Sequence, residues 1–404
     1  MSAMQKPANL AIELGGRSGF GGFPMAIRVG ESVYLGAQTL ARPAGFDPLA
    51  IEEPTHAAFQ GLVQTLAAAG LGMENLVKLH TYYVYQGQGH EVTRFWERMT
   101  QVRLKYLANP GPAATALRVQ GAPTRSRLIT VDGIATSSPR RTRLMPAHAW
   151  DWSIPTPFSQ GWRVEDKVFV GGQISADREG RAVAAGDAAA QTRNTLEYIR
   201  HVLKEADAEW SDVAMLKIAY RHDGGEASSR RLLSQILAVV RETVPEPRPA
   251  LTCFGVDLLY EGLLLEIDAI AALRQERAML EPASSGDWMR CQGFACGTRT
   301  GEEIYVGGIS APGAASLQAQ AEASMERVIS VVEAGRASAH DLVKLNVYFA
   351  SDERQETGDA CEIARILEEY LTQHRPVVSI VRVPGLPHSG QKIQIDGIAV
   401  AHSR

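Results

Sequence analysis

The stretch Leu265-Glu266-Ile267-Asp268-Ala269-Ile270-Ala271 occurs in three related versions along the chain. The other two are Ile129-Thr130-Val131-Asp132-Gly133-Ile134-Ala135 and Ile393-Gln394-Ile395-Asp396-Gly397-Ile398-Ala399. Short runs that are rich in branched apolar residues are typical of buried β-strands. Recurrence at a spacing of about 130 residues indicates tandem structural units, so each stretch is predicted to be the final strand of one unit.

Other blocks recur in the same order before each final strand. Each unit opens with an apolar strand that ends in small residues, and a helix with an apolar stripe follows it. In the first unit this stripe is formed by Phe59, Leu62, Val63 and Leu66. A second strand and a second helix come next. Opening strands are expected at 32–38, 167–173 and 303–309, second strands at 76–84, 213–220 and 342–349, and second helices near 91–107, 227–243 and 358–373.

The order of these elements predicts an α+β layer in which amphipathic helices cover one face of a sheet. We expect three units at residues 1–138, 147–274 and 285–404, with connectors near 136–149 and 274–287. Three fused copies favour a closed, pseudo-threefold ring, because each sheet can then bury its free face against its neighbours. An open array fits less well, since no capping repeats are evident. Clefts between units are the expected ligand sites.

Composition excludes several classes of protein. The 404 residues are 45% hydrophobic and 21% charged, which is typical of a globular protein. The 41 Lys and Arg residues against 45 Asp and Glu argue against nucleic acid as a partner, and the arginines within 140–143 are interpreted as a solvated connector. We expect no membrane span and no secretory signal. Four cysteines are too few for a disulfide scaffold, so reduced thiols and a cytoplasmic location are expected.

Four stretches of the second unit carry a family resemblance. They are Pro157-Phe158-Ser159-Gln160-Gly161, Val170-Gly171-Gly172-Gln173-Ile174, Pro249-Ala250-Leu251-Thr252-Cys253 and the final strand quoted first. Together they resemble the RidA family (also called YjgF or L-PSP), which contains enamine/imine deaminases. That family has a small chorismate-mutase-like α+β fold and assembles as a trimer with clefts between subunits. The resemblance extends over three tandem copies and implies an intramolecular pseudo-trimer.

The resemblance also implies site residues in the second unit. Glu266 matches the family glutamate that manages water or protons, and Cys253 matches the site cysteine, although a buried and inert thiol is the alternative for Cys253. Both are candidate catalytic residues. Candidate substrate-binding residues in this unit are Phe158, which replaces a family tyrosine, together with Ser159, Gly172, Gln173 and Thr252.

The family arginine that holds a substrate carboxylate has no counterpart at the matching positions. A guanidinium suits that task because it can bind both carboxylate oxygens. The matching positions hold Ala114, Leu251 and Val378. Arg118 and Arg382 lie four positions further along, on the same strand face but about 13 Å away, and are kept as candidate substrate-binding residues at that distance.

In the third unit, Met289-Arg290-Cys291-Gln292-Gly293 aligns loosely with Pro157-Phe158-Ser159-Gln160-Gly161. This alignment would place Arg290 and Cys291 at a cleft rim, where a guanidinium lowers the pKa of a thiol. Cys291 and Cys296 lack a nearby histidine pair, so no metal site is expected. No dinucleotide-binding motif occurs, and no cofactor is expected.

The recurring aspartates Asp132, Asp268 and Asp396 are interpreted as structural. Lysines recur as well, at Lys78, Lys217 and Lys344, so ion pairs between the two sets are expected. A tight turn at each aspartate is the other possibility.

The expected function is that of a cofactor-independent hydrolase of deaminase type. It would act on a small imine, enamine or amide in a cleft between repeats, with Glu266 relaying the proton. One alternative is a ring-opening amidohydrolase of the cyanuric-acid-hydrolase type, for which no clear Ser–Lys pair recurs. Another is a non-catalytic binding or regulatory protein with degenerate sites. The expected partner is a small molecule alone, and the chain is expected to act as a monomeric pseudo-trimer or in a higher homo-oligomer.

Overall fold

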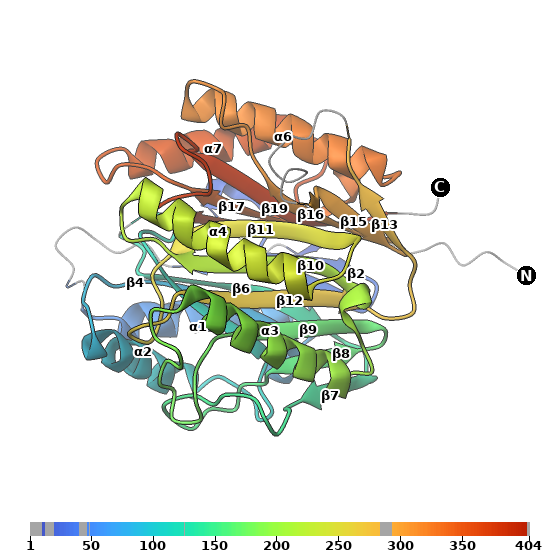
Figure 1. Cartoon of the computed structure of the whole chain (residues 1–404). Coiled ribbons are helices and arrows are strands. Elements are labelled where there is room, and N and C mark those ends of the chain that lie inside the picture. The colour runs from blue at the N-terminus through green and yellow to red at the C-terminus, as the bar shows by residue number, and fades with distance from the viewer. Residues whose placement is uncertain are drawn as a thin grey trace, which may run out of the picture.

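Three β-sheets with a shared strand order form the centre of the computed structural model, which describes residues 10–12, 20–39, 47, 49–124, 126–282 and 293–401 (Figure 1). Every predicted strand is present. The shared orders are β2(Ala26–Val29)-β3(Ser32–Thr39)-β6(Ile129–Thr136)-β4(Leu76–Val84)-β5(Ala113–Val119), then β8(Gly161–Val164)-β9(Lys167–Gln173)-β12(Leu265–Ala272)-β10(Val213–Arg221)-β11(Arg248–Val256), and β15(Gly297–Thr300)-β16(Glu303–Ile309)-β19(Ile393–Val400)-β17(Leu342–Phe349)-β18(Val377–Arg382).

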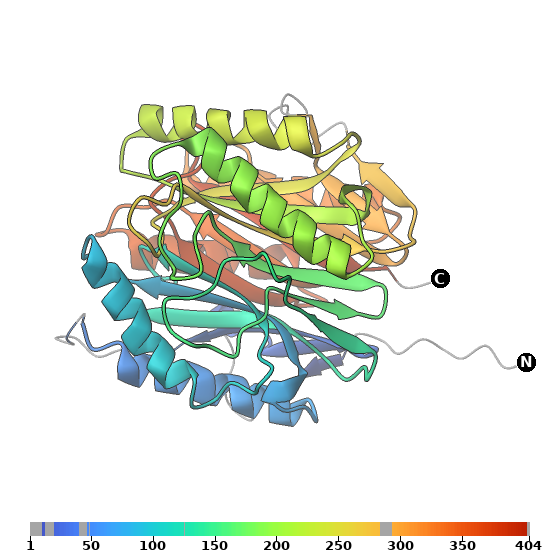
Figure 2. The same ribbon diagram turned by 60° about the horizontal axis from the view of Figure 1, so that its bottom comes forward.

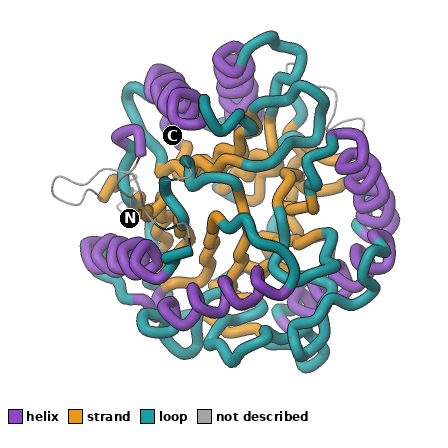
Figure 3. Tube along the Cα trace, turned by 90° about the vertical axis from the view of Figure 1, so that its left-hand side faces the viewer, coloured by secondary structure: helices purple, strands orange, loops and turns teal. Residues whose placement is uncertain are grey.

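Each sheet has two long helices on its outer face, and Figure 3 shows the helices at the periphery with the strands inside. The helices of a pair contact each other. One residue of the predicted stripe in the first unit is placed differently, because Val63 is 38% exposed whereas Phe59 and Leu62 are buried. The helices are α1(Glu52–Ala68), α2(His90–Arg103), α3(Ala188–Glu205), α4(Glu226–Thr243), α6(Leu317–Ala334) and α7(Glu356–Tyr370).

The three sheets meet one another in a closed order. β5 contacts β9, β11 contacts β16, and β18 contacts β3. The helices of the first sheet and those of the second sheet lie on opposite sides of the strands (Figure 2). Backbone hydrogen bonds close the same circuit at the strand ends. Asp257 N donates to Arg118 O at 3.0 Å, Gly255 N to Gly385 O at 2.9 Å, and Arg382 N to Gly121 O at 2.9 Å.

The segments predicted as connectors contain strands. β7(Arg141–Leu144) pairs antiparallel with β8, and β13(Arg277–Leu280) pairs antiparallel with β15. The arginines of 140–143 are therefore not all solvated. Arg143 donates from Nε to Ser159 Oγ at 3.0 Å and from Nη2 to Phe158 O at 2.7 Å, which corrects the connector interpretation for this residue.

Two short strands complete the sheets. β1(Leu10–Ile12) pairs antiparallel with β2 at the edge of the first sheet. β14(Phe294–Ala295) pairs parallel with β11 of the second sheet although it lies between β13 and β15 in the chain. A strand that follows β13 in the chain therefore extends the second sheet.

Buried ion pairs join each sheet to the next. Each involves a lysine of one sheet and an aspartate of another, so the expected pairing occurs between units and not within them. The N···O distances are 3.1 Å for Lys78–Asp268, 2.9 Å for Lys217–Asp396 and 3.1 Å for Lys344–Asp132.

The strand register corrects one equivalence among these residues. Lys217 lies opposite Asp268, just as His80 lies opposite Asp132, so Lys217 corresponds to His80 and Met215 takes the place of Lys78. His80 bridges two sheets, with Nδ1 3.1 Å from Asp132 Oδ1 and Nε2 3.0 Å from Asp268 Oδ2.

None of the helices in the described residues is long and apolar enough to cross a membrane.

Candidate active site

A small cavity lies where the first sheet meets the second, beside the contact between β5 and β9. Its volume is about 20 Å³, which holds little more than one water molecule. Both sheets, α2 and the connector after β7 contribute to its walls. The lining residues are Trp96, Arg103, Ala114, Ala116, Trp150, Trp152, Phe158, Gly172, Ile174, Leu259 and Glu266.

Glu266 presents a buried carboxyl group to this cavity from β12. Burial raises its pKa to about 8, and the nearby charge of Asp268 acts in the same direction. Lys78 and a backbone hydrogen bond from Ala116 act against the shift. Most of the Glu266 population is therefore protonated at neutral pH, so the group can donate a proton there.

Gly172 is required by the position of Glu266. A Cβ atom on Gly172 would lie only 1.8 Å from Glu266 Oε1. In the third sheet the corresponding pair is Gly308 and Gln394, and a Cβ atom on Gly308 would lie 2.5 Å from Gln394 Cδ.

The first sheet has Ala37 and Thr130 at the corresponding positions. Across the three sheets, a glycine thus faces a long side chain and an alanine faces a short one.

Arg103 lines the same cavity from the end of α2 and is fully buried. Its guanidinium lies over the ring of Phe158 at 4.5 Å, and Nη1 donates to Thr100 Oγ1 at 3.4 Å. Nε and Nη2 have no hydrogen-bond partner in the described part of the chain, and no carboxylate there pairs with them. Burial lowers the pKa of Arg103 to about 9.

Two tryptophans of the strand-free segment 146–157, which follows β7, cover the cavity. The centroids of Trp150 and Trp152 are 4.8 Å apart, and Trp152 is 5.6 Å from Phe158. Trp150 Nε1 donates to Gln173 Oε1 at 3.1 Å, and Gln160 Nε2 donates to Trp150 O at 2.8 Å. Gln173, predicted to bind substrate, thus supports a wall of the cavity.

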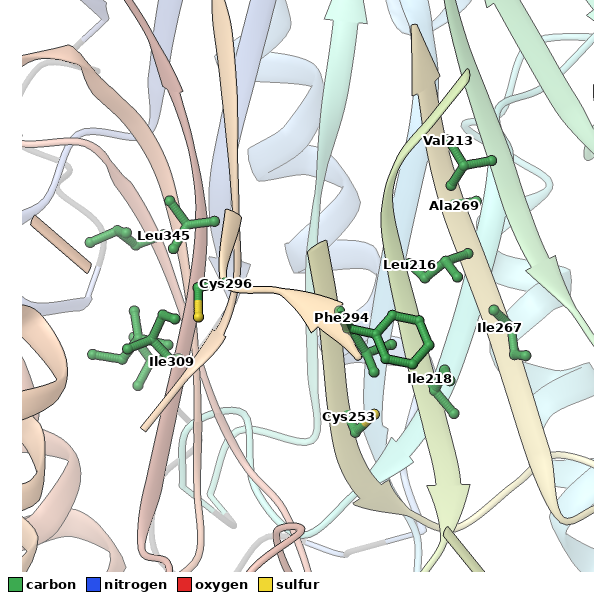
Figure 4. Packing of buried hydrophobic residues seen from close by; sticks show 14 of the residues in the cluster. Val213, Leu216, Ile218, Cys253, Ile267, Ala269, Phe294, Cys296, Ile309 and Leu345 are labelled. Atoms are coloured by element: carbon green, nitrogen blue, oxygen red, sulfur yellow. The ribbon is translucent and has the colours of Figure 1, made fainter. Parts of the chain in front are cut away.

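Cys253 lies in a different contact, between the second and third sheets. Figure 4 shows it close to Phe294 and Ile218 in an apolar cluster. Burial raises the pKa of this thiol well above its usual value, so the thiolate is disfavoured. The structure therefore does not bring Cys253 to Glu266: β12 faces one cleft and β11 faces the next.

Arg118 and Arg382 line a second cavity of about 450 Å³ at the strand ends, away from Glu266. Arg118 forms an ion pair with Asp257, and Arg382 Nη2 lies 3.0 Å from Glu356 Oε2. These arginines have structural partners and do not contribute to the walls around Glu266.

The remaining candidates have structural surroundings or fall outside the described residues. Ser159 Oγ donates to Gly111 O at 2.6 Å and so joins the second unit to the first. Thr252 is buried beside Cys253 and outside the cavity of Glu266. Arg290 and Cys291 lie outside the described residues.

The alignment proposed for the third unit is four residues out of register. Gly307 N donates to Cys296 O at 2.8 Å, as Gly171 N donates to Gln160 O at 2.8 Å. Phe294 therefore takes the place of Phe158, and Cys296 takes that of Gln160.

Sequence reasoning missed Arg103 and the tryptophans Trp96, Trp150 and Trp152. One signal was present. Trp96, Met99 and Arg103 have the i, i+3, i+7 spacing of one helix face, which puts a cation on a stripe that is otherwise buried.

Among the described residues, no three His, Cys, Asp or Glu side chains are grouped so that they would hold a metal ion.

Comparison with known proteins gives matches to one protein family. A profile of the family described as Endoribonuclease L-PSP matches residues 153–273. The 3-aminoacrylate deaminase RutC of Acinetobacter baylyi is 34% identical over 115 residues, which are 28% of this chain and 86% of the relative. A RutC family protein of Pyrococcus abyssi is 30% identical over 115 residues, with 28% and 85% coverage.

Solved structures resemble larger or smaller parts of the chain. A crystal structure of a chorismatase has a TM-score of 0.48 at 16% identity, covering 63% of this chain and 78% of that chain. A YjgF-family protein from Mycobacterium tuberculosis has a TM-score of 0.26 at 26% identity, covering 33% of this chain and 99% of that chain.

Proposed function

The chain belongs to the L-PSP (RidA/YjgF) family, and from this we propose that it is a cofactor-independent deaminase-like hydrolase of small enamines, imines or amides. One observation carries the proposal: the buried carboxyl group of Glu266 lines a cavity between two sheets with a pKa of about 8. A group with this pKa can both donate and accept a proton near neutral pH. The 3-aminoacrylate deaminase activity in the name of the Acinetobacter relative supports the same class of reaction.

The proposal includes three tandem family units at residues 1–138, 147–274 and 285–404 that form an intramolecular pseudo-trimer. The shared strand order of the three sheets supports this division, as do the contacts that return from the third sheet to the first. The active cleft is then the one between the first and second units, because among the three corresponding positions only Glu266 is an acid, beside Thr130 and Gln394.

Glu266 would act first as an acid and then as a base. With an enamine, the Glu266 carboxyl group protonates the carbon atom and leaves an iminium ion. The carboxylate then takes a proton from the water that attacks the iminium carbon, which gives a carbinolamine. Glu266 returns this proton to the amino group and accepts the hydroxyl proton as ammonia leaves. The products are a carbonyl compound and ammonia, and Glu266 ends protonated.

Glu266→Gln tests this role. The assay is ammonia release above the uncatalysed rate from a panel of small enamines and imines that includes 3-aminoacrylate. We expect at least about tenfold slower turnover for Glu266→Gln. For the wild type, activity should fall as pH rises through about 8, because the protonated form is the one that starts the reaction.

Glu261→Gln is the matched control, since Glu261 is an exposed carboxylate of the same unit. Wild-type turnover in Glu266→Gln would refute the proton relay. Absence of any acceleration by the wild type over the whole panel would instead favour a binding or regulatory protein, which the apolar surroundings of Cys253 in the neighbouring contact also suit.

A further inference from the structure

We propose that the cavity of Glu266 binds a small carboxylate with a planar, aryl-like body, and that Arg103 holds the carboxylate. The inference deepens the proposed function by naming a ligand class for the same cavity. It rests on the unpartnered guanidinium and on the aromatic walls around it.

The guanidinium of Arg103 is the first argument. Burial of a cation is unfavourable unless an anion or hydrogen-bond acceptors compensate for the lost water. In the described part of the chain the charged group makes one weak hydrogen bond to Thr100, lies over the face of Phe158 and interacts electrostatically with Tyr83. Nε and Nη2 have no partner among the described residues, although both are buried. Two donors in this arrangement suit the two oxygens of a carboxylate.

The walls of the cavity define the rest of the ligand. Trp96, Trp150, Trp152 and Phe158 contribute four aromatic side chains, and all of them are buried. Aromatic side chains favour offset or edge-on contact with another flat ring. Apart from Arg103 and Glu266, the described lining carries no ionisable group.

A monocarboxylate suits this site better than a phosphate ester. A phosphate ester carries close to two negative charges at neutral pH, whereas Arg103 supplies a single positive charge. Any deprotonated fraction of Glu266 would add a repulsive charge.

Binding of such a ligand requires the segment 146–157, which covers the cavity, to move. A volume of about 20 Å³ holds no aryl ring. The segment 146–157 contains no strand. It is held by hydrogen bonds of Trp150 to Gln173 and Gln160, and of Ser153 to Glu97 and Tyr260. Backbone hydrogen bonds from Asp151 N to Asp177 O and from Gly111 N to Pro157 O add to these. None of these hydrogen bonds pairs two strands of a sheet, so the segment would move as a loop while the sheets stay intact.

Benzoate is the test ligand, and benzamide is a neutral molecule of the same shape. Each is titrated into the full-length protein, and both the melting temperature and the tryptophan fluorescence are recorded. We expect benzoate to raise the melting temperature in proportion to the logarithm of its concentration above Kd, and benzamide and phenyl phosphate to bind at least about tenfold more weakly.

Arg103→Met should weaken benzoate binding at least about tenfold while its ligand-free melting temperature stays equal to or above that of the wild type, because an uncompensated buried charge is removed. Arg98→Met is the control, since Arg98 lies on the same helix and pairs with Glu52 at the surface. Its benzoate affinity should match that of the wild type.

Two results would overturn the inference: no benzoate-dependent change in the wild type, or equal benzoate affinity in Arg103→Met. Failure of the proposed function is separable from both. Full turnover in Glu266→Gln would refute the proton relay and leave Arg103-dependent benzoate binding in place.

Discussion

At the scale of single residues, the absence of a side chain at Gly172 makes room for the carboxyl group of Glu266 in the candidate site. Gly172→Ala would place a methyl group where Glu266 Oε1 now lies, so the carboxyl group must leave its position. We expect a loss of about 1–3 kcal/mol in the free energy of unfolding, measured by urea denaturation, together with a loss of turnover. The first unit already combines an alanine with a threonine at these positions, Ala37 and Thr130.

That natural combination provides the control for Gly172→Ala. In a Glu266→Thr background, Gly172→Ala should cost clearly less than it does alone, because the clash has been removed. An equal cost in both backgrounds would show that Glu266 does not determine the residue at position 172.

Residue-scale prediction from sequence relied on matching single positions to a family motif. Glu266 was chosen because it matches the family glutamate; the structure places it in the wall of a cavity, and its catalytic role stays a prediction. Arg103 does not follow in the same way, because its importance depends on the absence of a partner after folding. A sequence shows which residues are charged. Whether a buried charged group has hydrogen-bond partners depends on how the chain packs.

At the scale of elements, the short strand β7 ties the connector to the candidate site. Arg143 on β7 donates to Ser159 and to the carbonyl group of Phe158, whose ring lines the cavity. Arg143→Met should lower the free energy of unfolding by about 1–2 kcal/mol, because hydrogen bonds from a charged donor are lost. Urea denaturation measures this change, and turnover should fall as Phe158 loosens.

Arg140→Met is the matched control for Arg143→Met. Arg140 lies in the same connector, its side chain is 79% exposed, and it pairs with Glu165. A surface pair of this kind contributes at most about 1 kcal/mol. If the two variants lost equal stability, the anchoring role of Arg143 would be refuted.

The main strands and helices were largely predictable from the sequence, whereas the short strands at the sheet edges were not. The repeated strands follow from apolar patterning, which sheet burial enforces. β7 and β13 were missed because short edge strands with arginines resemble solvated connectors. The register of the third unit was also missed, since Met289-Arg290-Cys291-Gln292-Gly293 and Gly293-Phe294-Ala295-Cys296-Gly297 both end on glycine. The hydrogen bond from Gly307 to Cys296 and the pairing of Gly297 with Val306, which corresponds to that of Gly161 with Val170, distinguish them.

At the scale of the whole molecule, the closed order of contacts separates residues that are neighbours in one unit. β12 and β11 belong to the same sheet, yet Glu266 faces the first sheet and Cys253 faces the third. A sequence resemblance within one unit assigns Glu266 and Cys253 to the same site. It contains no information about which edge of the sheet meets which neighbouring sheet. The sequence predicted several α+β sheets, whereas the assignment of each side chain to a contact between sheets required coordinates.

The buried ion pairs between the sheets lead to a further prediction about the whole molecule. Lys344 Nζ contacts Asp132 Oδ1 at 3.1 Å and Leu35 O at 2.9 Å, so it joins the third sheet to the first. Burial alone would raise the pKa of Asp132, but Lys344 and His80 hold it well below its usual value. Lys344→Met leaves this carboxylate with less compensation.

We expect Lys344→Met to lower the free energy of unfolding by about 3–5 kcal/mol at neutral pH, measured by urea denaturation. The stability that Asp132 contributes in the wild type is present above its ordinary pKa and is lost as pH falls, so the difference between the two proteins should shrink under acid conditions. The double variant Lys344→Met/Asp132→Asn should recover part of the loss, because it removes the unpaired charge. Lys392→Met, at an exposed lysine of the same unit, should change little. If Lys344→Met were as mild as Lys392→Met at every pH, the ion pairs would not hold the ring together, and closure would depend on apolar contacts and backbone hydrogen bonds between the sheets.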